Sequence, residues 1–315
     1  MEWKQNIIED FKQLVSFDSI SFHERNTADW LLARLKSMGF SVEEDQAGAY
    51  YGGDTGNIFA VLDGELEGDP VIFCAHMDVV EPGSGKKSVL EKDGTIHSAG
   101  DTVLGADDIS GILEILYGVQ LVIDSGKPHK KIELLFTIGE ELYVKGSDVF
   151  DYSKVTAKQA YVLDLSEETT FNIGTIQGGT ATNIVPDCCV LTGEIRSYDH
   201  GKALETVRMT ERIFTEEAQK INATAEVTSQ IHLIAYETSL ESKSVTDFQK
   251  ACEILGFSGE LTGTFGGSDN NSFAKNGIEG LVLSNGMYNA HSTREYTTVD
   301  DLYKGAELIG QLILL

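Results

Sequence analysis

The sequence predicts an α/β protein in which helices cover both faces of a mixed sheet and a small α+β unit is inserted. Three observations predict this class: short apolar runs typical of buried strands, helical periodicity between these runs, and a change of pattern after about residue 170. The chain has 315 residues, of which 41% are hydrophobic, and this is enough for a large core.

Two amphipathic helices are predicted at the start of the chain. Apolar residues recur at three- and four-residue steps over residues 3–15 and over residues 30–38, and Gly39 follows the second run. Apolar runs of strand length then follow, with one long helical run among them. The predicted strands are residues 57–62, 71–75, 132–138 and 161–165, and the predicted helix is residues 110–123.

A different pattern begins after about residue 170. It predicts two neighbouring strands, a helix and a long alternating strand, at residues 172–176, 189–196, 203–218 and 225–236. The α/β pattern returns with a helix at residues 245–255, a strand at residues 280–284 and a last helix from residue 301. We therefore expect a main domain of residues 1–170 and 240–315, interrupted by an inserted domain of residues 171–239.

The charge of the chain argues against two classes of partner. Its 50 acidic and 24 basic residues give a net charge of -26, which repels nucleic-acid phosphates and anionic lipid surfaces. We therefore expect no nucleic-acid partner and no membrane partner. The first fifteen residues carry alternating charges, and the four cysteines lack zinc-finger spacing. These features predict a cytoplasmic protein with reduced thiols, and they leave a homo-oligomer open.

Acids and histidines follow directly after the predicted strands. His76 and Asp78 come after one apolar run, the adjacent Glu140 and Glu141 come after another, and Asp164 ends a third. In an open α/β sheet, ligands bind beyond the carboxyl ends of the strands, where loops present polar groups. We therefore expect these side chains to lie at one edge of the sheet.

Carboxylates also occur in adjacent pairs. Asp107 and Asp108 open the predicted helix at residues 110–123, and a cap at a helix start explains only one of them. Glu140 and Glu141 would repel each other and lose hydration at the end of an apolar strand unless a cation lies between them. A metal ion would relieve this cost, with one glutamate as its ligand and the other as a base.

Five segments of the chain appear in the order found in a family of zinc exopeptidases that includes peptidase T, aminoacylase and glutamate carboxypeptidase. They are AHMD at 75–78, GADD at 105–108, GEE at 139–141, LD at 163–164 and AHS at 290–292. The likeness extends over residues 5–310, with one gap, and the chain most resembles the peptidase T branch.

This resemblance implies two metal ions held by five protein ligands. His76 and Asp164 would hold one ion, Glu141 and His291 would hold the other, and Asp107 would bridge the two. Imidazole and carboxylate ligands suit zinc, which we expect here, and also cobalt or manganese.

The resemblance also implies a catalytic pair. Asp78 would orient His76. Glu140 would act as the general base, taking a proton from a metal-activated water and returning it to the leaving amine.

Three further residues resemble substrate-binding positions of the family. Asn183 and Arg196 match segments of its small lid domain, and Ser268 matches a loop beside the substrate. Arg196 could bind a carboxylate through two hydrogen bonds, and a surface ion pair is the competing interpretation. For Ser268, the competing interpretation is a turn that caps a helix.

The resemblance fails at the start of the lid. The family's lid begins with a strand and a helix that supply a histidine to the oxyanion, whereas Asp164 is followed almost at once by a later part of the lid. Neither His200 nor His232 lies in a matching motif, so neither is assigned this role. We therefore expect a truncated lid, a more open site and low activity on tripeptides, or a lid that a partner subunit completes.

The expected function is hydrolysis of short peptides by a metallopeptidase of the tripeptidase or aminopeptidase kind. Deacylation of N-acyl amino acids is an alternative, because the same ions and base serve any amide. A non-catalytic metal-binding protein with a relic site is a third possibility. Glu140 argues against it, because a structural zinc site closes its coordination and needs no neighbouring base.

Overall fold

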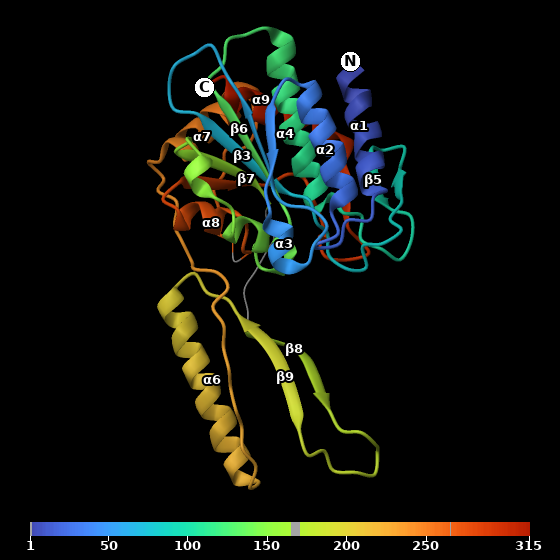
Figure 1. The fold of residues 1–315 in the computed structure, drawn as a ribbon, viewed down its shortest axis with the longest axis vertical. Coiled ribbons are helices and arrows are strands. Elements are labelled where there is room, and N and C mark those ends of the chain that lie inside the picture. The colour runs from blue at the N-terminus through green and yellow to red at the C-terminus, as the bar shows by residue number, and fades with distance from the viewer. Residues whose placement is uncertain (1, 165–170, 265) are drawn as a thin grey trace. The chain divides into compact units, whose positions relative to one another are not determined.

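A computed structural model describes residues 2–164, 171–264 and 266–315 (Figure 1). The contacts of the chain divide it into two compact units. The first is Met1–Leu165, Thr238–Thr262 and Gly267–Leu315, and the second is Ser166–Glu237 with Gly263–Gly266. Among the described helices, none is long and apolar enough to cross a membrane.

A six-stranded sheet forms the centre of the first unit. Its strands are β1 Ser41–Glu44, β2 Ile58–Leu62, β3 Val71–His76, β6 Ile132–Thr137, β7 Gln159–Leu163 and β10 Glu279–Leu283. They lie in the order β1-β2-β6-β3-β7-β10. The pairs β1–β2 and β2–β6 are antiparallel, and the remaining pairs are parallel. The prediction of a mixed sheet flanked by helices is confirmed.

Alternate residues of these strands point to opposite faces of the sheet. Phe73 and Leu134 belong to one buried apolar cluster, whereas their chain neighbours Ile72 and Leu135 belong to another. Because both faces are covered, the central strands are apolar at nearly every position, as the sequence runs show.

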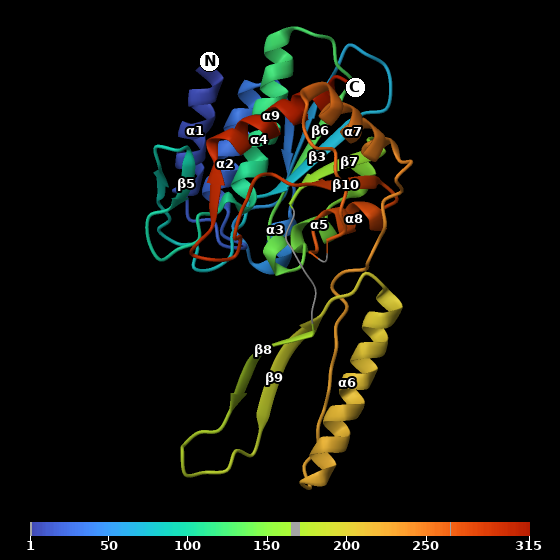
Figure 2. The same ribbon diagram turned by 180° about the vertical axis from the view of Figure 1, so that it is seen from behind.

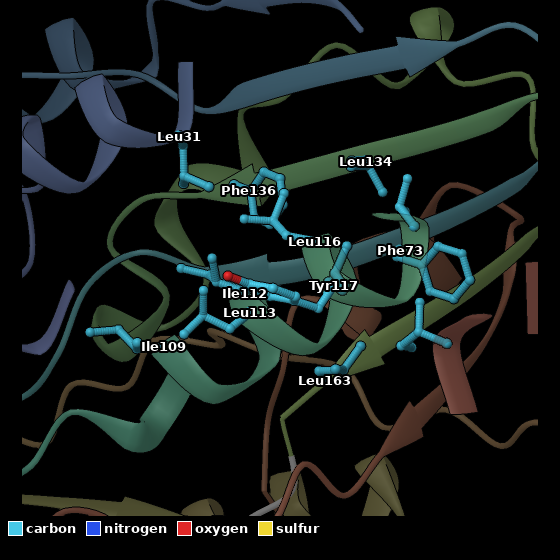
Figure 3. Close-up of a cluster of buried hydrophobic side chains, with 14 of the residues drawn as sticks. Leu31, Phe73, Ile109, Ile112, Leu113, Leu116, Tyr117, Leu134, Phe136 and Leu163 are labelled. Carbon is cyan, nitrogen blue, oxygen red and sulfur yellow. The ribbon is translucent and has the colours of Figure 1, made fainter. Parts of the chain in front are cut away.

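The larger cluster contains residues of six described helices. They are α1 Glu2–Val15, α2 Arg25–Ser37, α3 Ala47–Tyr51, α4 Ala106–Ser125, α7 Lys243–Leu255 and α9 Val299–Ile313. Leu113 and Leu116 of α4 belong to the same cluster as Phe73 and Leu134 of the strands (Figure 3). Helix α4 is buried along most of its length, as expected of a helix that is apolar nearly all round.

Helices α4 and α9 lie beside each other against the sheet (Figures 1 and 2). Their close approach requires glycine at position 118, because a Cβ there would lie 2.5 Å from Cβ of Ile309. The C-terminal helix therefore supports the helix that begins with Asp107.

The second face is covered by shorter segments. Phe273 of α8 Asn270–Lys275 and Tyr152 of the 3-10 turn Tyr152–Lys154 pack on this side, and Oγ of Ser147 in α5 Lys145–Asp148 donates to Ser272 of α8. A further 3-10 turn, Glu140–Leu142, follows β6. A small antiparallel sheet, in the order β11-β5-β4, joins β4 Ser88–Leu90, β5 Thr95–Ser98 and β11 Tyr296–Thr298. Its strands have only three or four residues, which is too short for a periodic signal.

The second unit contains an antiparallel pair and one long helix. These are β8 Phe171–Gly178, β9 Cys189–Ile195 and α6 His200–Lys220. The strand predicted at residues 225–236 is wrong, because the described segment is neither strand nor helix. It runs along α6 in both views (Figures 1 and 2).

Candidate metal centre

Three parallel strands bring the predicted residues to one edge of the main sheet. His76 is the last residue of β3, and the register of β3 with β6 sets it opposite Thr137. Glu140 and Glu141 follow β6 in a short 3-10 turn, and Asp164 follows the end of β7. The carboxyl ends of the strands therefore place these side chains together, as parallel pairing requires.

Asp107 lies between two histidines at the start of α4. Its Oδ1 atom is 3.0 Å from Nε2 of His76, and its Oδ2 atom is 3.1 Å from Nε2 of His291. The preceding Gly105 has a φ of 81°, a left-handed conformation that glycine adopts without strain and that turns the chain into the helix. Each oxygen of this carboxylate thus lies close to a different imidazole nitrogen.

His291 and Glu141 meet on the open side of the centre. Nε2 of His291 lies 3.0 Å from Oε2 of Glu141, and the imidazole side chain is 48% exposed, so the centre opens to solvent here. The other oxygen of Glu141, Oε1, is buried and has no hydrogen-bond partner within the described part of the chain. A buried carboxylate oxygen without a donor is costly unless a cation or water binds it.

The donor atoms form two overlapping groups that fit metal ions. His76, Glu140 and Asp164 offer atoms that lie within 4.8 Å of one another, and so do His76, Asp107 and Glu141. Nitrogen and carboxylate donors at such spacing suit zinc and neighbouring divalent metals. The two groups share His76, so the described donors fit a divalent cation beside this residue.

The carboxyl groups of the centre destabilise one another in their charged forms. Burial and then the charge of Asp164 raise the pKa of Glu140 well above its usual range. Burial and then the charge of Asp107 raise the pKa of Asp164 and of Glu141. Hydrogen bonds that the His291 ring donates to Asp107 and Glu141 raise the pKa of His291 to about 10. These acids repel one another, and a bound divalent cation would reduce this repulsion.

Asp78 supports both the histidine and the glutamate pair. Nδ1 of His76 lies 2.9 Å from the backbone oxygen of Asp78, closer than the 3.4 Å to its carboxylate. The carboxylate accepts hydrogen bonds from the backbone N–H groups of Glu140 and Glu141, at 2.9 and 3.2 Å, and from Oγ of Ser21. Asp78 thus fixes His76 through its main chain and the turn after β6 through its side chain.

Three acids to which the sequence analysis assigned no role also accept hydrogen bonds from backbone N–H groups near the centre. Asp108 accepts a hydrogen bond from the backbone N–H of His76, and Glu24 accepts one from that of Gly139. Glu295 accepts three from the residues around Asp107. Asp108 lies in the GADD segment, and Glu295 lies four residues after His291. Closeness in sequence to a predicted ligand was therefore the feature that could have pointed to these two residues.

A family model described as peptidase family M20/M25/M40 matches residues 72–315, which includes every residue of this centre. The chain belongs to that family. The predicted resemblance to the peptidase T branch is also confirmed, because several relatives and solved structures of this family carry that name.

Relatives in this family match nearly the whole chain. The uncharacterized protein YqjE of Bacillus subtilis is 28% identical over 364 residues, covering 98% of both chains. Aminopeptidase PepT of Bacillus cereus is 28% identical, covers 98% of both chains and has a TM-score of 0.87. A tripeptidase of Staphylococcus aureus is 25% identical, covers 98% of this chain and 97% of its own, and has a TM-score of 0.92.

The three residues expected to bind substrate lie outside the cluster of metal donors. Asn183 is an exposed turn residue of the second unit, and Nε of Arg196, in the same unit, contacts Glu194 at 2.9 Å, which matches the competing interpretation of a surface ion pair. Ser268 belongs to the first unit and accepts a hydrogen bond from the backbone N–H of Asn270, where α8 begins. A role in substrate binding stays a prediction for all three.

Proposed function

We propose that this member of the M20/M25/M40 family is an exopeptidase that hydrolyses short peptides at a centre of two divalent ions, with zinc as the expected metal. The observation that carries the proposal is the placement of Asp107 between His76 and His291, one oxygen toward each. A carboxylate that bridges two cations needs this arrangement. The names of the similar proteins, aminopeptidase PepT and a tripeptidase, support short peptides as the substrate class.

The proposed ligands divide between two ions. His76 and Asp164 would hold one ion, Glu141 and His291 would hold the other, and Asp107 would contact both. The orphaned oxygen of Glu141 and the mutual repulsion of the buried acids support this set. When bound, such ions supply Lewis-acid polarisation of the scissile carbonyl and lower the pKa of a water molecule.

Glu140 is the proposed general base. Its side chain is only 8% exposed, and its backbone is fixed by the hydrogen bond to Asp78. It takes a proton from the attacking water and delivers this proton to the leaving amine nitrogen.

We propose that the lid of this chain is shorter than the lid of its relatives. The match to YqjE extends over 364 residues, more than the 315 of this chain, so the relative has segments without a counterpart here. We assign residues 1–170 and 240–315 to the catalytic domain and residues 171–239 to a shortened lid. The histidine that the family's lid contributes to the oxyanion would then be missing. The join after Asp164 lies at residues 165–170, outside the described residues.

Two adjacent isosteric substitutions test the assignment of the glutamates. Glu140→Gln should lower kcat by about 100- to 10,000-fold, the usual contribution of a general base, while two ions per chain remain bound. Glu141→Gln should instead weaken the binding of one ion, because a carboxamide is a poor zinc ligand. Elemental analysis and kcat on tripeptides are measured on the same samples.

Because both variants make the same chemical change one residue apart, each serves as the control for the other. Glu140→Gln with turnover close to that of the wild type would exclude this residue as the base. Loss of an ion from Glu140→Gln, with both ions retained in Glu141→Gln, would reverse the two roles. A wild-type chain that binds no more than one ion after zinc loading would contradict the two-ion centre.

A further inference from the structure

The turn that leads into helix α4 carries Asp107, whose φ of -83° and ψ of 98° are not helical. Asp108 caps the regular part of the helix, because its carboxylate accepts a hydrogen bond from the backbone N–H of Gly111 at 3.2 Å. Glu295 supplies acceptors to the turn before it, from a segment 190 residues later in the chain. Its Oε2 atom accepts from Leu104 and Gly105, both at 2.8 Å, and its Oε1 atom accepts from Asp107 at 2.9 Å.

This arrangement is favourable for three reasons. Glu295 is only 1% exposed, so its hydrogen bonds do not compete with water. The acceptor is a carboxylate, and charge-assisted hydrogen bonds are about twice as strong as neutral ones. The negative charge also lies at the positive end of the helix dipole. The carboxylate therefore fixes the backbone from which the side chain of Asp107 projects.

The segment that contains Glu295 also carries His291. Tyr288 and Tyr296 close this loop through two backbone hydrogen bonds, of 2.9 and 3.0 Å, and their rings stack. Inside the loop, the N–H of Glu295 donates to the backbone oxygen of Ser292. His291 itself has a left-handed φ of 61° and is half exposed, so little packing holds its ring.

We propose that Glu295 is a positioning residue that sets the spacing between Asp107 and His291, and so the affinity of the ion that these two residues share. It belongs to the His291 loop through its main chain and holds the Asp107 turn through its side chain. The inference rests on the two-ion centre proposed above. His76 depends on it less, because the β3 ladder and the Asp108 carboxylate hold its backbone.

Glu133 provides a matched control on the same unit. It is fully buried like Glu295, and its carboxylate likewise accepts backbone hydrogen bonds, from Thr156 and Ala157. It lies near the start of β6, whereas the metal donors follow the end of that strand. Glu133→Gln therefore removes a comparable buried carboxylate that binds backbone N–H groups, at a position distant from the metal donors.

The test titrates metal-free wild type, Glu295→Gln and Glu133→Gln with zinc by calorimetry, and unfolds each metal-free protein in urea. Glu295→Gln should lower the affinity for the second zinc ion by about 10- to 100-fold, the usual effect of losing a residue that supports a metal ligand. Glu133→Gln should lower stability and leave both zinc affinities unchanged. In peptidase assays, Glu295→Gln should need correspondingly more zinc for half-maximal activity.

Glu295→Asp covers the case in which the glutamine variant does not fold. It keeps the charge but is one methylene shorter, so it should not reach all three N–H groups, and zinc affinity should again fall. Wild-type affinity in Glu295→Asp or Glu295→Gln would overturn the inference, and so would an equal loss in Glu133→Gln. If the wild type binds two ions, such results leave the proposed function intact. A wild type that binds only one ion overturns both.

Discussion

A substitution at Glu114 measures how much one buried carboxyl group changes the free energy of unfolding of this protein. It lies within α4, is 1% exposed, and its Oε1 atom has no hydrogen-bond partner in the described part of the chain. The opposing helix makes room for it with Gly305, where a Cβ would lie 2.0 Å from the carboxyl carbon. Burial, and then the charges of Asp108 and Asp301, raise its pKa well above the usual range.

The sign of the pH dependence follows from this shift. In the unfolded chain, a glutamate loses its proton at about pH 4.3. Folded Glu114 keeps the proton to a higher pH, so the folded state binds more protons over the interval between the two pKa values. The free energy of unfolding should therefore fall as pH rises through this interval, by up to about 1.4 kcal/mol per pH unit from this one group.

Glu114→Gln removes the titration while preserving the shape of the side chain. At about pH 5 the variant should be less stable than the wild type by about 1–3 kcal/mol, because the new amide has no partner for its N–H groups. As pH rises, the wild type should lose its advantage at the slope given above. The free energy of unfolding is measured by urea titration of the metal-free proteins from about pH 5 to about pH 8.

Asp124→Asn is the control for Glu114→Gln. Asp124 lies on the same helix but is exposed, so its difference from the wild type should stay small at every pH. A difference between the wild type and Glu114→Gln that does not change with pH would refute the reasoning, because it would mean that the folded carboxyl titrates as an ordinary one.

Two further predictions follow from the packing of the helices and from the lid. Gly118→Ala should destabilise the protein by about 1–3 kcal/mol, because its Cβ would overlap Ile309 and overpacking exceeds the roughly 1 kcal/mol gained in helix propensity; an unchanged urea midpoint would contradict it. Tripeptide turnover should be low, since a missing oxyanion donor costs about 3–4 kcal/mol of barrier. Replacement of His200 and His232 by alanine should not change it further; efficient turnover in that double variant would show that the lid histidine is dispensable.

Five strands of the main sheet could be predicted from the sequence, whereas the edge strand β1 could not. Strands β2, β3, β6, β7 and β10 are apolar runs, so burial on both faces leaves a clear signal. Strand β1 has the sequence Ser-Val-Glu-Glu and alternates between exposed and half-buried residues, so it resembles a loop. The alternating segment at residues 225–236 led to the opposite error, because alternating polarity also occurs in segments that are not strands.

In the candidate site, side-chain chemistry was predictable and backbone support was not. His76 and Asp164 end apolar strands, and parallel pairing requires such ends to share an edge. Glu24 and Glu295 act on backbone N–H groups, which every residue has, so no pattern of residue types points to them. The carboxylate of Asp78 holds the turn after β6 for the same reason, a contact that the motif alone does not reveal.

The order of the donors along the chain has a consequence for synthesis. His76, Asp107 and Glu141 leave the ribosome early, but His291 comes near the end and α9, which packs on α4, comes last. Domains emerge from the N-terminus first, so a growing chain has most of the acids before it has their final partner. An unfinished or prematurely terminated product therefore lacks a donor and the helix that supports α4. Such a product should have no peptidase activity against its neighbours in the cell.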